Sequence, residues 1–260
     1  MTGVTLSLDK RDVATLTIDR AEVHNAFDDQ LIEQLLEALD QVELEPKIRA
    51  LILRSNGNNF SAGADLRWMR RMADYSREEN HADAMKLARL MKKLNRLSRP
   101  TVAQVQGAAL GGGVGLVACC DIAVAAADAV FALSEVRLGL IPAVISPYVI
   151  AAIGERAARR YFLTAERFNA VEAHRLGLVH EIVDETALDG AANAMVDHLL
   201  KGGPAALTSA KELIFSVARQ PITNELIIDT AERITDIRAS EEGRGGVTAF
   251  LQKRAAPWSE

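Results

Sequence analysis

Three consecutive glycines, Gly111, Gly112 and Gly113, interrupt an apolar stretch and constrain the fold more than any other feature of this chain. The β-branched run Thr101–Val105 precedes them, and a small-residue apolar segment, residues 114–120, follows. We expect a strand, a glycine turn and a buried helix in that order. Such a turn leaves unpaired N–H groups at a helix start, where the helix dipole favours negative charge and glycine lets a ligand come close. The pattern therefore predicts a place that can stabilise an oxyanion.

A glycine triplet is also the composition of an ordinary tight turn, and neither phosphate-binding glycine motif is present. The sequence lacks GxxxxGK[ST], and Leu116 breaks GxGxxG. A second small-residue turn, residues 61–65 (Ser-Ala-Gly-Ala-Asp), follows another apolar strand pattern at residues 50–53. Two such turns, each between a strand pattern and a helix pattern, can supply the pair of backbone donors that an oxyanion hole needs.

The composition excludes several classes of protein. The 260 residues suffice for one large domain, or one domain with an appendage, and 49% hydrophobic with 25% charged residues is ordinary for a globular protein. A net charge of −5 without long runs of one sign argues against a nucleic-acid partner. No CxxC or HExxH spacing occurs, so we expect no metal, and we interpret Cys119 and Cys120 as small buried residues. With neither a signal peptide nor a membrane-spanning run, a cytoplasmic location is expected.

Strand and helix patterns alternate over the first part of the chain, and only helix patterns follow. Val4–Leu8 and Val13–Ile18 read as a hairpin, and Asp28 as the cap of an amphipathic helix. The alternation predicts an α/β core with crossover connections over residues 1–184. Residues 185–260 read as a helical region of the kind that packs on a neighbouring subunit.

Motifs at regular order and spacing run through nearly the whole chain. They are Ile18-Asp19-Arg20, Asn25-Ala26-Phe27, SAGADL (61–66), QGAALGGG (106–113), CDIAVA (120–125), LSEVRLGLIP (133–142), TAERFNAVEAHRLGLV (164–179) and AFLQKR (249–254). Together they resemble the crotonase superfamily, the enoyl-CoA hydratase/isomerase family. The resemblance implies a crotonase-type ββα spiral with a C-terminal helical trimerisation region, in a homotrimer or a dimer of trimers. Within the family, the chain looks like the bacterial methylglutaconyl-CoA and carboxygeranoyl-CoA hydratases.

The resemblance also implies the ligand and its contacts. The substrate would be an acyl-CoA thioester, with no separate cofactor because coenzyme A is part of the substrate. Backbone N–H groups of Ala64 and Gly112 would form the oxyanion hole for the thioester carbonyl, which agrees with the two turns above. The positions matching substrate or CoA contacts are Val23, His24, Ala62, Ala64, Asp65, Leu66, Gly111, Gly112, Phe250 and Lys253. The alternatives stay open that Asp65 caps the next helix and that Lys253 is a solvated charge.

Hydratases of this family usually carry two glutamates, and only one matches here. Glu135 occupies one place, as the catalytic acid/base, and Gly115 occupies the other. A lone glutamate still permits hydration of an enoyl-CoA, with methylglutaconyl-CoA as the best single substrate. It also suits a Δ3,Δ2-enoyl-CoA isomerase, the second choice, and a non-catalytic acyl-CoA-binding or assembly protein is the alternative from another class. Arg137 is either a structural arginine or the partner of a carboxylate on the acyl chain.

Overall fold

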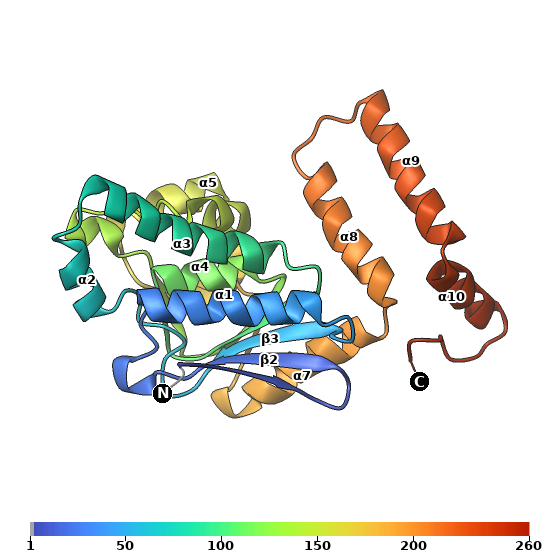
Figure 1. Cartoon of the computed structure of the whole chain (residues 1–260), viewed down its shortest axis with the longest axis horizontal. Helices are drawn as coiled ribbons and strands as arrows, with labels where there is room; N and C mark the ends of the chain where they lie inside the picture. Colours follow the sequence, from blue (N-terminus) through green and yellow to red (C-terminus); the bar gives the residue numbers. More distant parts are fainter. Residues whose placement is uncertain (1–2, 260) are drawn as a thin grey trace.

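Two β-sheets and the helices that cover them make up the chain, whose computed structural model describes residues 3–259 (Figure 1). The strands are β1 (Val4–Leu8), β2 (Val13–Ile18), β3 (Ala50–Ser55), β4 (Thr101–Val105), β5 (Ala108–Leu110), β6 (Ile122–Ala126), β7 (Val130–Ala132), β8 (Phe168–Asn169) and β9 (Glu181–Val183). A six-stranded sheet has the order β1-β2-β3-β4-β6-β9, antiparallel at β1–β2 and parallel elsewhere, and a three-stranded sheet has the order β5-β7-β8.

The helices complete the layers on both faces of the larger sheet. They are α1 (Asp29–Leu44), α2 (Leu66–Met72), α3 (Arg77–Asn95), α4 (Gly112–Cys119), α5 (Ser146–Thr164), α6 (Ala170–Leu176), α7 (Leu188–Leu200), α8 (Pro204–Val217), α9 (Asn224–Ala239) and α10 (Glu241–Leu251), with short 3₁₀ helices η1 (Ala21–Val23), η2 (Glu135–Leu138) and η3 (Glu185–Ala187). In Figure 1, α1, α3 and α4 lie above the sheet and α7 lies beneath it.

Most predicted elements are confirmed, and local chemistry explains their limits. Asp28 caps α1 by accepting the N–H of Leu31, and Gly154, at φ +76°, breaks α5. The strand expected to run directly into the glycine turn is wrong in one respect, because β5 intervenes. This strand lacks the β-branched residues of β4, and its pairing with β7 stabilises it, so no local pattern indicates it.

The C-terminal helices divide into one that joins the core and three that project from it. Leu188, Ala192 and Val196 of α7 are buried against the second face of the large sheet. Helices α8, α9 and α10, the helical arm, extend away from the sheets (Figure 1). The domain boundary predicted at residue 185 stays a prediction, and α7 lies on the core side of the arm.

An ion pair between a buried lysine and a partly exposed aspartate fixes the first helix of the arm. Lys211 of α8 is buried, and its Nζ lies 2.7 Å from the Asp121 carboxylate and donates to the backbone oxygen of Arg99 at 3.2 Å. Asp121 also accepts hydrogen bonds from the N–H and the hydroxyl of Thr101, at 2.8 and 2.9 Å. A buried charge needs such pairing, so Asp121 joins α8 to the strand-bearing core.

Arg49 holds the two ends of the arm together. Its guanidinium donates to the carbonyl oxygens of Leu200 and Gly202, just before the arm, at 3.1 and 2.9 Å, and to that of Trp258, just after it, at 3.1 Å. The Trp258 indole in turn donates to the carbonyl of Lys201 at 3.0 Å. The chain therefore leaves the core and returns to it at one place.

Among residues 3–259, no helix is both long enough and apolar enough to cross a membrane.

Candidate active site

The two predicted small-residue turns lie against each other. The N–H of Ser61 donates to the carbonyl of Ala108 at 2.9 Å, and the N–H of Leu110 donates to the carbonyl of Ser61 at 2.8 Å. A Cβ on Gly113 would lie 3.0 Å from the Cβ of Ser61, so glycine permits this close approach without a shift of Ser61. The sequence predicted each turn, and the pairing of Ser61 with β5 brings them together.

Two backbone amides at this junction are available to a ligand. Gly112 is the first residue of α4, so its N–H has no acceptor within the helix. In residues 3–259, the N–H of Ala64 donates to no backbone or side-chain oxygen. The N–H of the next residue, Asp65, does have an acceptor, the carbonyl of Phe27. Both residues are at least partly exposed. The arrangement fits the predicted oxyanion hole, whose assignment remains a prediction.

Glu135 lies beside the same glycine turn. It begins η2, after β7, and a Cβ on Gly111 would lie only 3.2 Å from its Oε1. Its Oε2 is buried and has no hydrogen-bond partner in the described chain. Burial raises the pKa of the Glu135 carboxyl above its ordinary value, because desolvation disfavours the charged form. A half-buried carboxylate with a raised pKa next to unpaired amides suits acid–base chemistry.

The predicted CoA contacts divide by position. Val23 and Asp65 line a cavity of about 440 Å³ with Arg20, Arg67 and Arg71. Ala62, Ala64 and Leu66 lie in or beside the second turn, and the exposed His24 has its Nδ1 3.1 Å from the amide of Asn59. Asp65 also caps α2, since it accepts the N–H groups of Arg67 and Trp68, so the structural alternative for this residue holds in this structure.

The other two predicted contacts lie far from the turns in the same chain. Phe250 and Lys253 belong to α10 and its end, on the opposite side of the molecule from α2 in Figure 1. Both are exposed. Within the single chain, neither residue takes part in the site, and their role stays a prediction.

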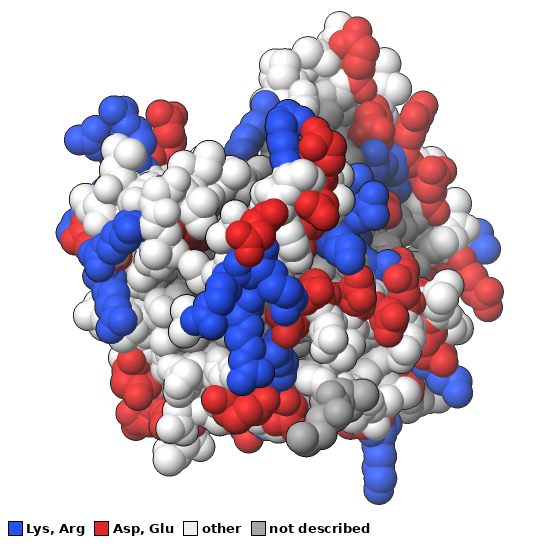
Figure 2. All heavy atoms as spheres, turned by 60° about the vertical axis from the view of Figure 1, so that its left-hand side comes forward, with Lys and Arg blue, Asp and Glu red and all other residues white. Residues whose placement is uncertain are grey.

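The face that carries α2 is mixed in charge. Figure 2 turns the left-hand side of Figure 1 forward and shows Lys and Arg side chains gathered near its middle, with acidic groups around them. Helix α2 contributes the exposed Arg67, Arg70 and Arg71 to this side of the molecule. Arg137 is also exposed, and it belongs to no ion pair among the described residues.

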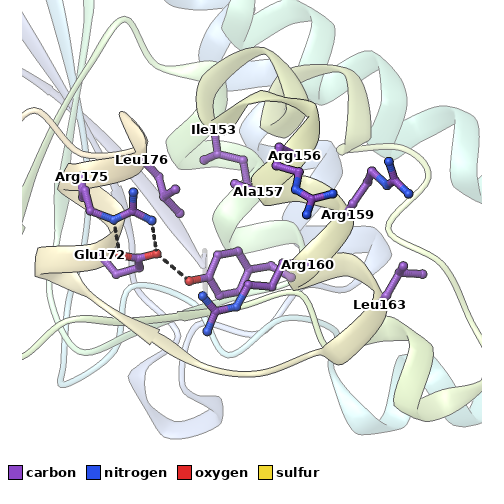
Figure 3. Close-up of a pocket in the computed structure, with 10 residues that line it drawn as sticks. Ile153, Arg156, Ala157, Arg159, Arg160, Leu163, Glu172, Arg175 and Leu176 are labelled. Carbon is purple, nitrogen blue, oxygen red and sulfur yellow. Dashed lines mark hydrogen bonds and ion pairs between the residues drawn. The ribbon is translucent and has the colours of Figure 1, made fainter.

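A larger cavity, of about 680 Å³, lies between α5 and α6 (Figure 3). Glu172 accepts hydrogen bonds there from Arg175 and from the hydroxyl of Tyr161. These partners lower the pKa of Glu172 to about 2, so it stays ionised and is a poor proton carrier. Neither Ala64, Gly112 nor Glu135 lines this cavity, which we interpret as a structural ion-pair network.

Sequence reasoning missed the side chains that shape the site from behind. The ring of Phe27, almost fully buried, would lie 3.3 Å from a Cβ on Gly112. Ile145 occupies the space next to Gly115, where the second glutamate of the resembled family would stand. A glycine at position 115 predicts that another side chain packs there, but the sequence alone does not identify Ile145 as that side chain.

An α/β fold that places two unpaired amides beside a half-buried glutamate is suited to stabilising the enolate of an acyl thioester. A model of the Enoyl-CoA hydratase/isomerase family matches residues 9–260, and the chain belongs to that family. A solved enoyl-CoA hydratase from Shewanella pealeana superposes with a TM-score of 0.96 at 47% identity, covering 98% of this chain and 96% of that one. The match confirms the predicted crotonase fold.

Relatives that are named for different reactions have similar sequence identity to this chain. A crotonyl-CoA hydratase from Syntrophomonas wolfei is 31% identical, over 94% of this chain and 93% of its own. A 1,2-epoxyphenylacetyl-CoA isomerase from Escherichia coli is 32% identical over 96% of both chains. The chain is therefore an enzyme of the hydratase/isomerase type, and its individual reaction depends on its own site.

Proposed function

We propose that this enzyme adds water across the 2,3 double bond of an enoyl-CoA thioester. The observation that carries the proposal is the junction of the unpaired Ala64 and Gly112 amides beside the Glu135 carboxylate. As substrate we propose a branched enoyl-CoA, with methylglutaconyl-CoA as the best single candidate. The cavity that Val23 and Asp65 line is mixed in charge, since Asp28 pairs with Arg20 and Asp29 with Arg71. Arg67 forms none of the ion pairs among residues 3–259, and we propose that it meets the negatively charged nucleotide end of coenzyme A.

The chemistry needs one carboxylate and two donors. Glu135 takes a proton from water as the water oxygen bonds to Cβ, and the π electrons move onto the thioester oxygen as an enolate. The N–H groups of Ala64 and Gly112 stabilise that oxygen, each by about 3–4 kcal/mol when well placed. Glu135 then returns a proton to Cα as the enolate collapses. General acid–base catalysis of this kind contributes roughly 10²–10⁴-fold.

The glycine at position 115, in place of a second glutamate, supports a second candidate, a Δ3,Δ2-enoyl-CoA isomerase. Moving a double bond requires removal of one proton and return of another, without an attacking water to position. Glu135 alone can carry both transfers. The similarity to a relative that is named as an isomerase is compatible with this alternative.

Turnover of an enoyl-CoA panel separates these candidates. Crotonyl-CoA, methylglutaconyl-CoA and a 3-enoyl-CoA are incubated with the enzyme, and the products are identified by mass spectrometry. Hydration, fastest for the branched substrate, is the expected result. Conversion of the 3-enoyl-CoA to its 2-enoyl isomer without hydration would replace the first proposal by the second. No turnover, with no calorimetric binding of acetyl-CoA at millimolar concentration, would exclude both.

The pH dependence should report the buried glutamate. Glu135 must be ionised to accept a proton from water, and burial raises its pKa. We therefore expect kcat/KM for crotonyl-CoA to fall on the acid side, with an apparent pKa above that of an ordinary glutamate. A profile whose acid limb is unchanged in the residual activity of Glu135→Gln would assign that limb to another group.

We also propose that the enzyme is a homotrimer or a dimer of trimers assembled through the helical arm. Apolar side chains on the arm stay exposed in the single chain, among them Ile227, Ile228, Ile234 and Phe250. Light scattering at micromolar concentration should give three or six times the 28.2 kDa chain mass. A monomer throughout that range would contradict the proposal.

A further inference from the structure

Gly115 and Ile145 pack as a matched pair. A Cβ on Gly115 would lie 2.3 Å from Cγ2 and 3.0 Å from Cβ of Ile145, and 3.2 Å from Cε of Met91. The first separation is impossible for non-bonded carbons, so Ile145 occupies the volume that a side chain at 115 would take. Ile145 and Met91 are 3% and 0% exposed, which leaves neither side chain free space toward solvent.

This pair borders Glu135. The N–H of Gly115 donates to the carbonyl of Gly111 at 3.2 Å, so the two glycines are about one helical turn apart, about 6 Å along the axis. Glu135 Oε1 faces Gly111, and Ile145 covers Gly115. Both side chains come from the segment that joins β7 to α5. That segment thus places a carboxylate at the first turn of α4 and an apolar side chain one turn further.

Ile145 is also an ordinary member of the hydrophobic core, and core packing alone could explain its burial. Its position supports a further role for three reasons. It comes from the same segment as Glu135, it covers the helical turn next to the glycine that Glu135 faces, and it fills the space where a second acidic side chain would have to stand. A core residue in such a place also forms the wall of the reaction site.

We propose that Ile145, seated over Gly115, is a specificity-determining residue that closes the acyl pocket beside Glu135. The inference rests on the proposed function, since it assigns a wall of the same acyl-CoA site. The wall excludes a second carboxylate and accepts only apolar parts of the acyl group. A branch methyl fits against it, and a carboxylate on the acyl chain must point elsewhere. Removing the side chain should therefore admit longer acyl chains.

Binding of saturated acyl-CoA thioesters tests the wall without requiring turnover. Acetyl-CoA, butyryl-CoA, isovaleryl-CoA and hexanoyl-CoA are titrated by calorimetry into the wild type and Ile145→Ala. We expect the hexanoyl-to-acetyl affinity ratio to rise roughly 10-fold or more, since one methylene in an apolar pocket changes discrimination by that order. Ile145→Val, which is smaller only by Cδ1, should shift the ratio in the same direction by less. An unchanged ratio in both variants would overturn the proposal.

A matched cavity elsewhere controls for general loosening. Val196 of α7 is fully buried on the opposite face of the sheet. Val196→Ala should lower the thermal unfolding midpoint as Ile145→Ala does, and it should leave the affinity ratio unchanged. If Val196→Ala shifts the ratio equally, the effect belongs to stability and the assignment to Ile145 is wrong.

The same variants test the pairing itself. Gly115→Ala should lower the unfolding midpoint, because its methyl overlaps Ile145, and Gly115→Glu should lower it further. In the Ile145→Ala background, Gly115→Ala should cost less than in the wild type, because the 2.3 Å contact with Cγ2 is gone while the Cβ of residue 145 and Met91 stay close. Additive losses in the double variant would contradict the packing argument.

The two proposals fail in different ways. If the wild type turns over no enoyl-CoA but substitution of Ile145, and not of Val196, changes the affinity ratio, the proposed function is refuted and the role of Ile145 stands. A wild type that hydrates the panel with an unchanged ratio refutes the wall alone. A protein that binds none of the thioesters refutes both.

Discussion

Glu135→Gln is expected to lower kcat by roughly 10²–10⁴-fold and to leave the affinity for a saturated acyl-CoA nearly unchanged. Glutamine keeps the shape of the side chain but cannot exchange protons. The substitution should not lower stability. Burial raises the pKa of Glu135 in the folded state, so the ionised carboxylate opposes folding once the pH rises above the ordinary pKa of a glutamate. At neutral pH the variant should be at least as stable as the wild type. Steady-state kinetics on the best substrate and thermal unfolding measure the two effects.

Glu155→Gln provides the control for this change. Glu155 is exposed on α5, immediately after the break at Gly154, and the same isosteric substitution there should alter neither kcat nor the unfolding midpoint. Wild-type turnover by Glu135→Gln would show that another group carries the proton and that the mechanism is wrong.

Asp121→Ala should destabilise the protein by about 1–3 kcal/mol, the range for leaving a buried polar group without its partner. Among residues 3–259, the change leaves the Lys211 ammonium with the carbonyl of Arg99 as its one remaining acceptor. It also removes the acceptor of the N–H and hydroxyl of Thr101. Urea unfolding at one protein concentration should show a lowered midpoint.

Asp197→Ala is the matched control, because its ion pair with Arg11 is formed at the surface, at the same 2.7 Å. An exposed pair contributes about 0–1 kcal/mol, so this variant should unfold close to the wild type. Equal losses in the two variants would mean that burial of Lys211 is unimportant for the attachment of α8.

The fold was predictable where local patterns are strong. β1, β2, β4 and β6 begin and end where alternation or β-branched runs indicate, and α1 begins after its predicted cap. Short elements such as β5 and β8 were not predictable, since partners distant in sequence stabilise them. The 3₁₀ helix that carries Glu135 also lacks a local signal of its own.

The site was predictable from its backbone and not from its walls. Glycine turns that follow strands indicate free amides, and the resemblance selected Glu135. The contact between Gly115 and Ile145 spans thirty positions of chain, counted from their numbers, and depends on how the η2–α5 segment crosses α4. Packing of this kind depends on the assembled core, so the sequence shows the small residue at 115 but not that Ile145 packs against it.

The bonds of Arg49 to both ends of the arm restrict how subunits can meet. An arm with a free end can be exchanged between two copies, and the result is a domain-swapped oligomer. Here the chain returns to Arg49 at Trp258, and Lys211 holds α8 at the other side. Exchange would require both attachments to break. Helices α9 and α10 lie between these two attachments, so the proposed oligomer would form by docking of preformed surfaces.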